Sequence, residues 1–254
     1  ERGVVCVGLD TALDYIPSFI KEGKSEEDAI VEFNKGIIDA TEDVAACFKV
    51  QIAYYEALGI KGLMAYKRTL EYLREKDAII ISDIKRGDIQ ATAKQYAKGH
   101  FEGDFEADFI TLNPYRTSNK GAEDIEYLDT TSGDKVYTVV GDKLMEMGKN
   151  LVSHCGYHPL GGVIGCTHVE EGKALRKRFN SMFFLIPGYG AQGGKAEDVA
   201  MYLNNGNGGV VNSSRGILLA YKKANKPEED YAKCAREEAI RMRDEINSAV
   251  EALK

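Results

Sequence analysis

The stretch AIIISDIK, residues 78–85, is an apolar run rich in β-branched residues that ends in alternating polar and charged residues. Runs of about four to eight such residues predict strands that are buried in a sheet. Six further runs have the same character and are bounded by Gly, Asp, Asn or Pro: VVCVGLD (4–10), AACFKVQ (45–51), ADFITLN (107–113), GGVIGCT (161–167), SMFFLIPGYG (181–190) and GGVVNSS (208–214). The sequence therefore predicts seven strands.

Amphipathic stretches separate these runs. Residues 26–44 carry apolar side chains at a spacing of three to four, from Ile30 to Ala40, with acidic residues on the other face. This period predicts a helix with one buried side, and Ser25 is a suitable residue for its start. Residues 228–253 have a similar pattern and predict a closing helix.

Strands that alternate with helices, and that are apolar along their whole length, predict a parallel sheet covered by helices on its outer side. The length of 254 residues is typical of a (β/α)8 barrel, and without a linker or low-complexity tract we expect one domain over residues 1–254. An eighth strand is expected between Tyr115 and Gly161. KVYTVV (135–140) could be that strand, but it could equally begin a helix.

The composition and charge of the chain argue against several classes of function. The net charge of −7 argues against nucleic-acid binding by a broad basic surface, although it leaves room for a local basic pocket. No run of 18 apolar residues and no secretory-signal pattern occur, so we expect neither a membrane span nor export. The five cysteines are widely spaced without a CxxC pair, which predicts a reducing compartment and places three in the core: Cys6, Cys47 and Cys166.

Charged residues gather at the ends of the first three predicted strands. Because side chains alternate along a strand, Asp83 and Lys85 share one face of the third strand, and Lys49 and Gln51 share one face of the second. Asp10 ends the first strand. In a barrel these positions look toward the active-site mouth. The alternative is a set of solvated loop charges, but an alternating array of this kind must pair to be buried and is typical of sites that tune proton transfer.

The run SMFFLIPGYG, which would be the seventh strand of an eight-stranded barrel, leads into PGYGAQGG (187–194), which contains the pattern GxGxxG. A dinucleotide-binding fold would need this pattern after an early strand, with an acidic residue about 20 positions later. Here the pattern follows a late strand, and the next strand carries Asn212 where the dinucleotide-binding pattern would need an acidic residue. A phosphate-binding glycine loop beside Arg215 is favoured, and a surface salt bridge is the alternative for that arginine. The histidines lack a metal-ligand spacing: His100, His154, His158 and His168.

Taken together, these segments resemble the orotidine 5′-monophosphate decarboxylase family. The resemblance is carried, in the family's order, by VGLD (7–10), FKVQ (48–51), SDIKRGDI (82–89) with Thr92, TLNPY (111–115), RTSN (116–119), PGYGAQGG (187–194) and NSSRGI (212–217). It implies a (β/α)8 barrel that acts as a cytoplasmic homodimer without metal or organic cofactor. The implied reaction converts orotidine 5′-monophosphate (OMP) to UMP and CO2 in de novo pyrimidine biosynthesis.

The resemblance also implies a role for each matching residue. The implied catalytic residues are Lys49, Asp83, Lys85 and Asp88. The implied substrate-binding residues are Asp10, with Lys49, at the ribose, Ser118 and Pro187 at the base, Gln192 between phosphate and base, Arg215 at the phosphate, and also Ile89, Gly190 and Ser214. Thr92 is a further substrate-binding residue and, with Asp88, reaches the neighbouring subunit's site.

One departure from the family pattern matters. In the family, the NPY end of the fourth strand is followed by a helix and a fifth strand before RTSN, whereas here Tyr115 runs straight into Arg116. A closed barrel cannot lose a strand and its helix without opening an edge. We therefore predict that a helix–strand segment of roughly two dozen residues is absent between these positions.

Two alternatives stay open. The first is a magnesium-dependent sugar-phosphate decarboxylase or aldolase of the same barrel superfamily, which resembles this chain at Asp-x-Lys-x-x-Asp but has an acidic residue where Lys49 stands. The second is a non-catalytic barrel that binds a phosphorylated ligand. Such a binder would not need Lys85 between two carboxylates.

Overall fold

The computed structural model describes residues 3–114, 123–190 and 193–254. Within them lie seven strands: β1 (Val5–Gly8), β2 (Cys47–Gln51), β3 (Ile80–Arg86), β4 (Phe109–Leu112), β5 (His158–Val163), β6 (Met182–Pro187) and β7 (Gly209–Ser213). Their hydrogen-bonded order is β4-β3-β2-β1-β7-β6-β5. The β1–β2, β2–β3, β3–β4 and β5–β6 pairs are parallel, as the alternation of strands and helices predicts.

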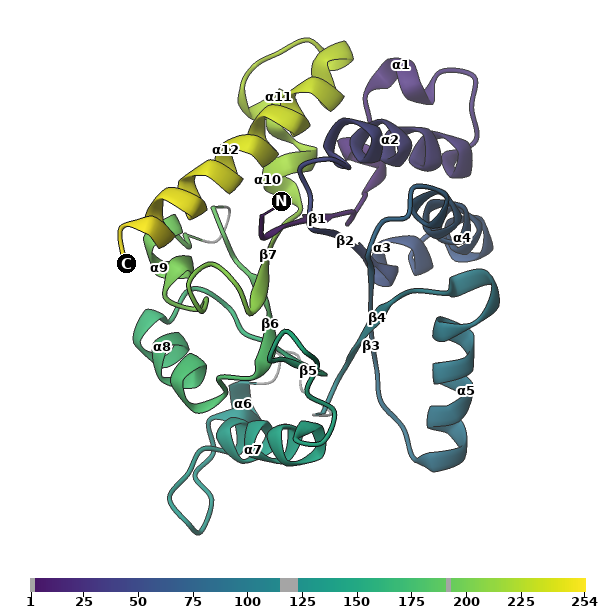
Figure 1. Cartoon of the computed structure of the whole chain (residues 1–254). Coiled ribbons are helices and arrows are strands. Elements are labelled where there is room, and N and C mark those ends of the chain that lie inside the picture. Colours follow the sequence, from purple (N-terminus) through teal and green to yellow (C-terminus); the bar gives the residue numbers. More distant parts are fainter. Residues whose placement is uncertain (1–2, 115–122, 191–192) are drawn as a thin grey trace. The chain divides into compact units, whose positions relative to one another are not determined.

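The chain folds into two compact units, and the first contains residues 1–112 and 212–245. Its helices are α1 (Ser18–Lys21), α2 (Glu26–Thr41), α3 (Ile52–Glu56), α4 (Gly59–Glu75), α5 (Gln90–Phe101), α10 (Arg215–Leu218), α11 (Ala220–Lys223) and most of α12 (Tyr231–Glu251), with short 3-10 turns at Leu13–Tyr15, Gly103–Phe105 and Glu228–Asp230. Helices α2 and α4 pack against each other beside the strands (Figure 1).

Helix α2 confirms the predicted start and buried face. The Ser25 side chain accepts a hydrogen bond from the amide of Asp28 at 3.1 Å, which satisfies one of the free donors at the helix N-terminus. Acidic residues fill the first turn, where the helix dipole favours negative charge. Ile30, Phe33 and Ile37 are completely buried, so the apolar side of the helix faces the core.

The second unit contains residues 113–211 and 246–254. Its helices are α6 (Glu123–Glu126), α7 (Val136–Gly148), α8 (Val169–Arg178) and α9 (Ala196–Ala200). Residues 135–140 therefore begin a helix, and the expected eighth strand is not among the described residues. Strand β5 begins at His158, three residues before the predicted run, and ends at Val163, so the prediction of a strand over 161–167 was wrong at both ends.

A buried guanidinium that the sequence did not indicate lies in the core of this second unit. Arg176 donates hydrogen bonds to four backbone carbonyls and lies 3.5 Å from the centre of a phenyl ring; the partners are Tyr202, Phe179, Met182 and Gly208, and the ring is that of Phe184. Burial without a carboxylate partner lowers the pKa of Arg176 to about 10. The side chain ties α8 to the chain entering β6 and β7.

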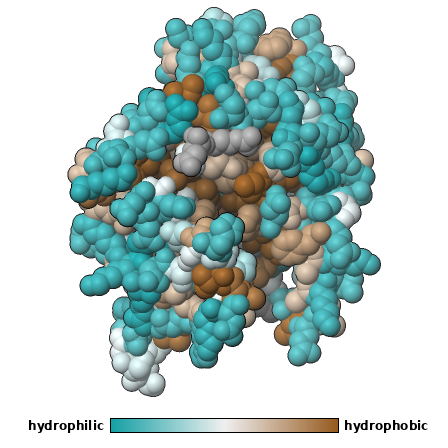
Figure 2. Space-filling model, in the orientation of Figure 1, coloured by the Kyte–Doolittle hydropathy of each residue, from teal (hydrophilic) through white to brown (hydrophobic). Residues whose placement is uncertain are grey.

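The face of the molecule shown in Figure 2 is covered mostly by hydrophilic residues, as amphipathic helices require. Over the described ranges, no helix is long and apolar enough to cross a membrane. All five cysteines are free thiols, and Cys6, Cys47 and Cys166 are buried as predicted, whereas Cys155 is exposed.

Candidate active site

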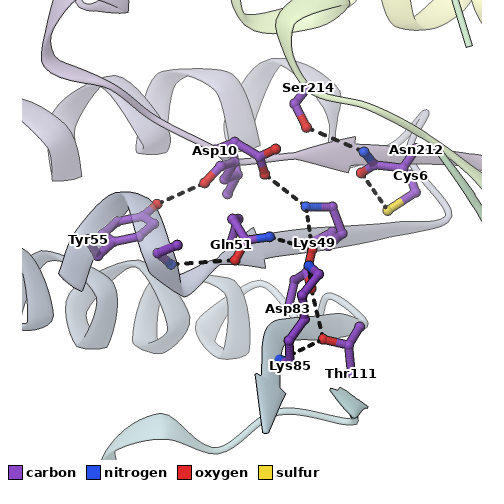
Figure 3. A network of polar contacts seen from close by, with 12 residues as sticks. Cys6, Asp10, Lys49, Gln51, Tyr55, Asp83, Lys85, Thr111, Asn212 and Ser214 are labelled. Carbon is purple, nitrogen blue, oxygen red and sulfur yellow. Dashed lines mark hydrogen bonds and ion pairs between the residues drawn. The ribbon is translucent and has the colours of Figure 1, made fainter. Parts of the chain in front are cut away.

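The ends of the first three strands bring together an alternating row of carboxylates and ammonium groups (Figure 3). Lys49 on β2 places its Nζ 2.8 Å from Oδ1 of Asp10 and 3.2 Å from Oδ2 of Asp83 on β3. Lys85 extends the row, with its Nζ 2.5 Å from Oδ1 of Asp83. The predicted sharing of one face is therefore confirmed, and we call these four residues the charge array.

Asp83 is the most heavily contacted member of the charge array. Its Oδ2 also accepts a hydrogen bond from Nε2 of Gln51 (2.8 Å), and its Oδ1 also accepts one from Oγ1 of Thr111 on β4 (2.8 Å). Burial alone would raise the pKa of the Asp83 carboxyl, but Lys49, Lys85 and Thr111 outweigh burial, so the pKa lies below its ordinary value. Asp83 is thus a fixed negative charge at neutral pH.

The two lysines of the charge array differ in exposure. Only 5% of the Lys49 side chain is exposed; burial would lower its pKa, but the charges of Asp10 and Asp83 raise it above the ordinary value, so this lysine stays charged. The Lys85 side chain is 56% exposed. Lys85 is therefore the more accessible ammonium of the array, while Lys49 holds the two carboxylates in place.

A buried polar network fixes the backbone on both sides of Asp10. The Tyr55 hydroxyl donates to the carbonyl of Leu9 (3.2 Å), and Oγ1 of Thr11 donates to Oδ1 of Asn34 (2.6 Å). Asn34 on α2 in turn donates to the Tyr55 hydroxyl on α3 (2.9 Å), and burial raises the pKa of this tyrosine. Helices α2 and α3 thus hold Asp10 in position although it lies beyond the end of β1.

The end of β7 and the residue that follows it, Ser214, lie against β1. Nδ2 of Asn212 is 3.3 Å from the Ser214 hydroxyl, and Oδ1 of Asn212 lies 3.6 Å from the Cys6 sulfur. A Cβ on Gly8 would lie 1.9 Å from Oγ of Ser214, so only glycine leaves room for this approach. Arg215, the first residue of α10, is exposed, as a phosphate-binding guanidinium must be.

The other predicted site residues lie outside the charge array. Asp88, Ile89 and Thr92 are exposed in the loop after β3 and the first turn of α5, where the Ile89 amide donates to Oδ1 of Asp88 (2.8 Å). Pro187 ends β6, and Gly190 adopts a left-handed φ of 68° in a glycine loop that closes on itself. Ser118, Gln192 and the junction of Tyr115 with Arg116 are not among the described residues.

Thr111 is a site residue that the sequence pattern did not indicate. Its signal is a hydroxyl in an otherwise apolar strand run, two positions before Asn113. Within the described part of the chain, no group of three or more His, Cys, Asp or Glu residues forms a candidate metal site.

Comparisons with known proteins agree on one family. Residues 3–122 match the family model described as orotidine 5′-phosphate decarboxylase / HUMPS family. A Clostridium tetani protein named orotidine 5′-phosphate decarboxylase is 60% identical over 275 positions, covering 98% of this chain and 95% of the relative. A protein of the same name from Clostridium perfringens strain 13 is 62% identical, with 98% and 96% covered.

Solved structures confirm the fold. The structure of Leishmania donovani OMP decarboxylase is 26% identical, with a TM-score of 0.77 over 98% of this chain and 95% of that chain. Leishmania donovani UMP synthase is 28% identical, with a TM-score of 0.71, and this chain covers 54% of it. The predicted (β/α)8-barrel class is therefore correct.

Proposed function

The chain belongs to the orotidine 5′-phosphate decarboxylase family and is a carboxy-lyase, and we propose that its charge array carries the conversion of OMP to UMP and CO2. The observation that supports this assignment is the Lys85 ammonium, which is exposed at one end of the array and is held 2.5 Å from an ionised, buried carboxylate. A group in this position can act on one substrate atom as both an electrostatic stabiliser and a proton donor.

The reaction breaks the bond between C6 of the orotate ring and its carboxylate carbon. The electron pair of that bond stays at C6, and no adjacent carbonyl can take it up directly. The positive charge of Lys85 stabilises this carbanion-like state, and a proton then moves from its Nζ to C6 to give UMP. The lysine becomes neutral and regains its proton from solvent, which its 56% exposure allows.

Asp83 acts on the ground state of the reaction. Its contacts with Lys49, Gln51 and Thr111 hold it ionised and immobile. With the substrate carboxylate at ~4 Å and an effective dielectric of about 20, the repulsion is roughly 4 kcal/mol, and it is relieved as CO2 departs. This contribution is a fraction of a typical enzymatic barrier reduction, so it cannot account for the whole effect.

The ribose and the phosphate of OMP are bound by residues that do not act on C6. Asp10 and Lys49 hold the ribose hydroxyls, and Arg215 with Ser214 binds the phosphate. Because the phosphate does not react, its binding energy can be used to order and close the site. The close approach of Ser214 to Gly8 supports this placement, since it fixes the residue that precedes the guanidinium.

We further propose a homodimer in which each site borrows residues from its partner. In its own chain Asp88 is exposed, as are Ile89 and Thr92, and all three lie outside the charge array. This position suits residues that complete a second copy's site across a two-fold axis. Five free thiols without a disulfide favour the cytoplasm as the compartment.

We also propose that the barrel is one domain and that the present sequence lacks one helix–strand segment between Tyr115 and Arg116. The alignment with the Clostridium tetani relative has 275 positions, so at least 21 of them have no counterpart among these 254 residues. On β4, Phe109 is 47% and Leu112 63% exposed, whereas strands of parallel sheets are normally covered on both faces.

Incubation of the purified chain with OMP, with EDTA or with added magnesium, tests the function and its rivals together. We expect UMP and CO2 to form at the same rate in all conditions, because Lys49 and Lys85 occupy the positions at which Asp10 and Asp83 would otherwise bind a cation. Activity lost in EDTA and restored by magnesium would assign the sugar-phosphate class instead. Binding of OMP without turnover would assign a non-catalytic binding protein.

A further inference from the structure

Strands β3 and β4 pair irregularly at the point where β3 carries the charge array. Ser82 pairs with Ile110 and Arg86 pairs with Leu112, so three residues of β3 lie opposite a single residue of β4, which is Thr111. A bulge of this kind redirects side chains and is common beside active sites. Within the bulge Lys85 has φ +46°, a left-handed conformation that non-glycine residues rarely adopt. The surrounding structure must therefore hold this conformation in place.

The Thr111 hydroxyl contacts both charged residues of the bulge. Its Oγ1 donates a hydrogen bond to Oδ1 of Asp83 (2.8 Å) and accepts one from the backbone amide of Lys85 (3.1 Å). The direction of both bonds is fixed, since an ionised carboxylate only accepts and an amide only donates. Thr111 is buried, so water cannot replace these bonds without entering the site.

We propose that Thr111 is a positioning residue for decarboxylation, whose hydroxyl locks the Asp83 carboxylate and the left-handed backbone of Lys85 into the geometry that the reaction needs. The proposal rests on the proposed function. A regular strand would satisfy the Lys85 amide through the sheet, but the bulge removes that partner and the hydroxyl takes its place. One hydroxyl thus fixes the two groups that act on C6 and on the departing carboxylate.

Thr111→Val removes the hydroxyl and keeps the shape of the side chain, and Thr111→Ser keeps the hydroxyl. We expect Thr111→Val to lower kcat about 10- to 100-fold, as the loss of hydrogen bonds to a charged group implies, with KM little changed because the phosphate and ribose contacts remain. Thr111→Ser should restore most of kcat. If Thr111→Val does not fold, Thr111→Ala compared with Thr111→Ser isolates the hydroxyl in the same way.

Thr41→Val is the matched control. Thr41 is a fully buried threonine whose hydroxyl bonds the backbone of α2 at Ile37 (2.7 Å), away from the charge array. The Thr41→Val variant should lose about as much stability to urea as Thr111→Val, and its kcat should stay at the wild-type value. Equal kcat in Thr111→Val and Thr41→Val, at wild-type levels, would overturn the positioning role.

The pH profile separates positioning from a purely structural role. Because the Thr111 hydroxyl is one of the groups that lower the pKa of Asp83, Thr111→Val should move the acidic limb of kcat/KM to higher pH. The ionisable groups around Asp83 are Lys49 on β2, Asp10 after β1, Lys85 and Arg86 on β3, Glu56 on α3 and Tyr66 on α4, all of which both variants retain.

A carboxyl titration by 13C NMR, assigned with Asp83→Asn, gives the same pKa without turnover. An Asp83 pKa that rises in Thr111→Val supports the proposal, and an unchanged pKa contradicts it. A wild-type chain that does not decarboxylate OMP would refute the proposed function, and the positioning role with it. A wild-type chain that turns over while Thr111→Val matches it would refute only the positioning role.

Discussion

Lys49→Met should destabilise the chain strongly, and more at neutral than at acidic pH. Lys49 is buried between two carboxylates, with its Nζ 2.8 Å from Asp10 and 3.2 Å from Asp83. Removing one partner of a buried ion pair costs about 3–5 kcal/mol, and the half-exposed Lys85 compensates only part of the charge of Asp83. Methionine has a similar length, so most of this loss is electrostatic.

The sign of the pH dependence follows from Asp83. In the wild type its pKa lies below the unfolded value of 3.8, so it stabilises the fold above that pH, and this contribution is lost as the pH falls through the folded pKa. Burial is the largest influence on the Asp83 pKa and Lys49 is the largest one that opposes it, so we expect the Asp83 pKa of the variant to rise above the unfolded value even though Lys85 and Thr111 remain. The variant therefore loses stability as the pH rises from about 4 toward the raised pKa, by about 1.4 kcal/mol for each pH unit between the unfolded and folded pKa values.

Urea unfolding followed by far-ultraviolet circular dichroism, at pH 4.5 and pH 7, measures this difference. Lys67→Met is the control, because Lys67 also lies between two carboxylates, 2.7 Å from Asp104 and 3.7 Å from Glu71, but at the surface. Water screens that site, so little change is expected at either pH. A loss below ~1 kcal/mol for Lys49→Met, or a loss that is larger at pH 4.5 than at pH 7, would refute the electrostatic reasoning.

Three further predictions concern the substrate. Arg215→Ala should lower kcat/KM about 10- to 100-fold, mainly through KM, since it contacts the non-reacting phosphate; an unchanged kcat/KM would show that the phosphate site is misplaced. Gly8→Ala should also raise KM, because its Cβ would lie 1.9 Å from Oγ of Ser214, and wild-type kinetics would argue that Ser214 does not shape the phosphate site. Mixing inactive Lys85→Ala and Asp88→Ala dimers should restore activity toward about a quarter of wild type, since mixed dimers have one intact site; no recovery after verified exchange would place Asp88 in its own chain's site.

The charged part of the site follows from the sequence because side-chain direction in a strand is a local property. On a regular strand, a spacing of two residues predicts that Asp83 lies beside Lys85 and that Lys49 lies beside Gln51. Parallel strands then bring these pairs to the same end of the sheet. The contacts of Asp83 with Lys49, Gln51 and Lys85 confirm that these groups meet, although Lys85 reaches Asp83 from a left-handed backbone.

The irregular backbone of β3 at Lys85 could not be predicted in the same way. The left-handed φ of Lys85 and the three-to-one pairing with Thr111 depend on the register between β3 and β4, which the residues of β3 alone do not set. Nor does a sequence show that the Arg176 guanidinium is enclosed by carbonyls from four separate positions.

The predicted and observed bounds of helices and strands also differ in the second unit. Residues 135–140 suit a strand by composition, but Gly141 leaves room for the ring of Phe179, which lies against helix α7. Strand β5 can include Pro159 because it is last in the strand order of the described residues, where a missing amide needs no partner.

The most direct test of the central claim is the Lys85→Ala variant, with CO2 release from OMP and the Kd for UMP measured on the same folded preparation. Lys85 supplies both charge stabilisation and the proton, and it is the exposed ammonium of the charge array. Turnover should fall by at least about 10³-fold, while UMP, which lacks the reacting carboxylate, should bind nearly as in the wild type. Turnover within about tenfold of the wild type, in a variant that unfolds cooperatively in urea, would contradict the assignment of Lys85 as the group that acts at C6.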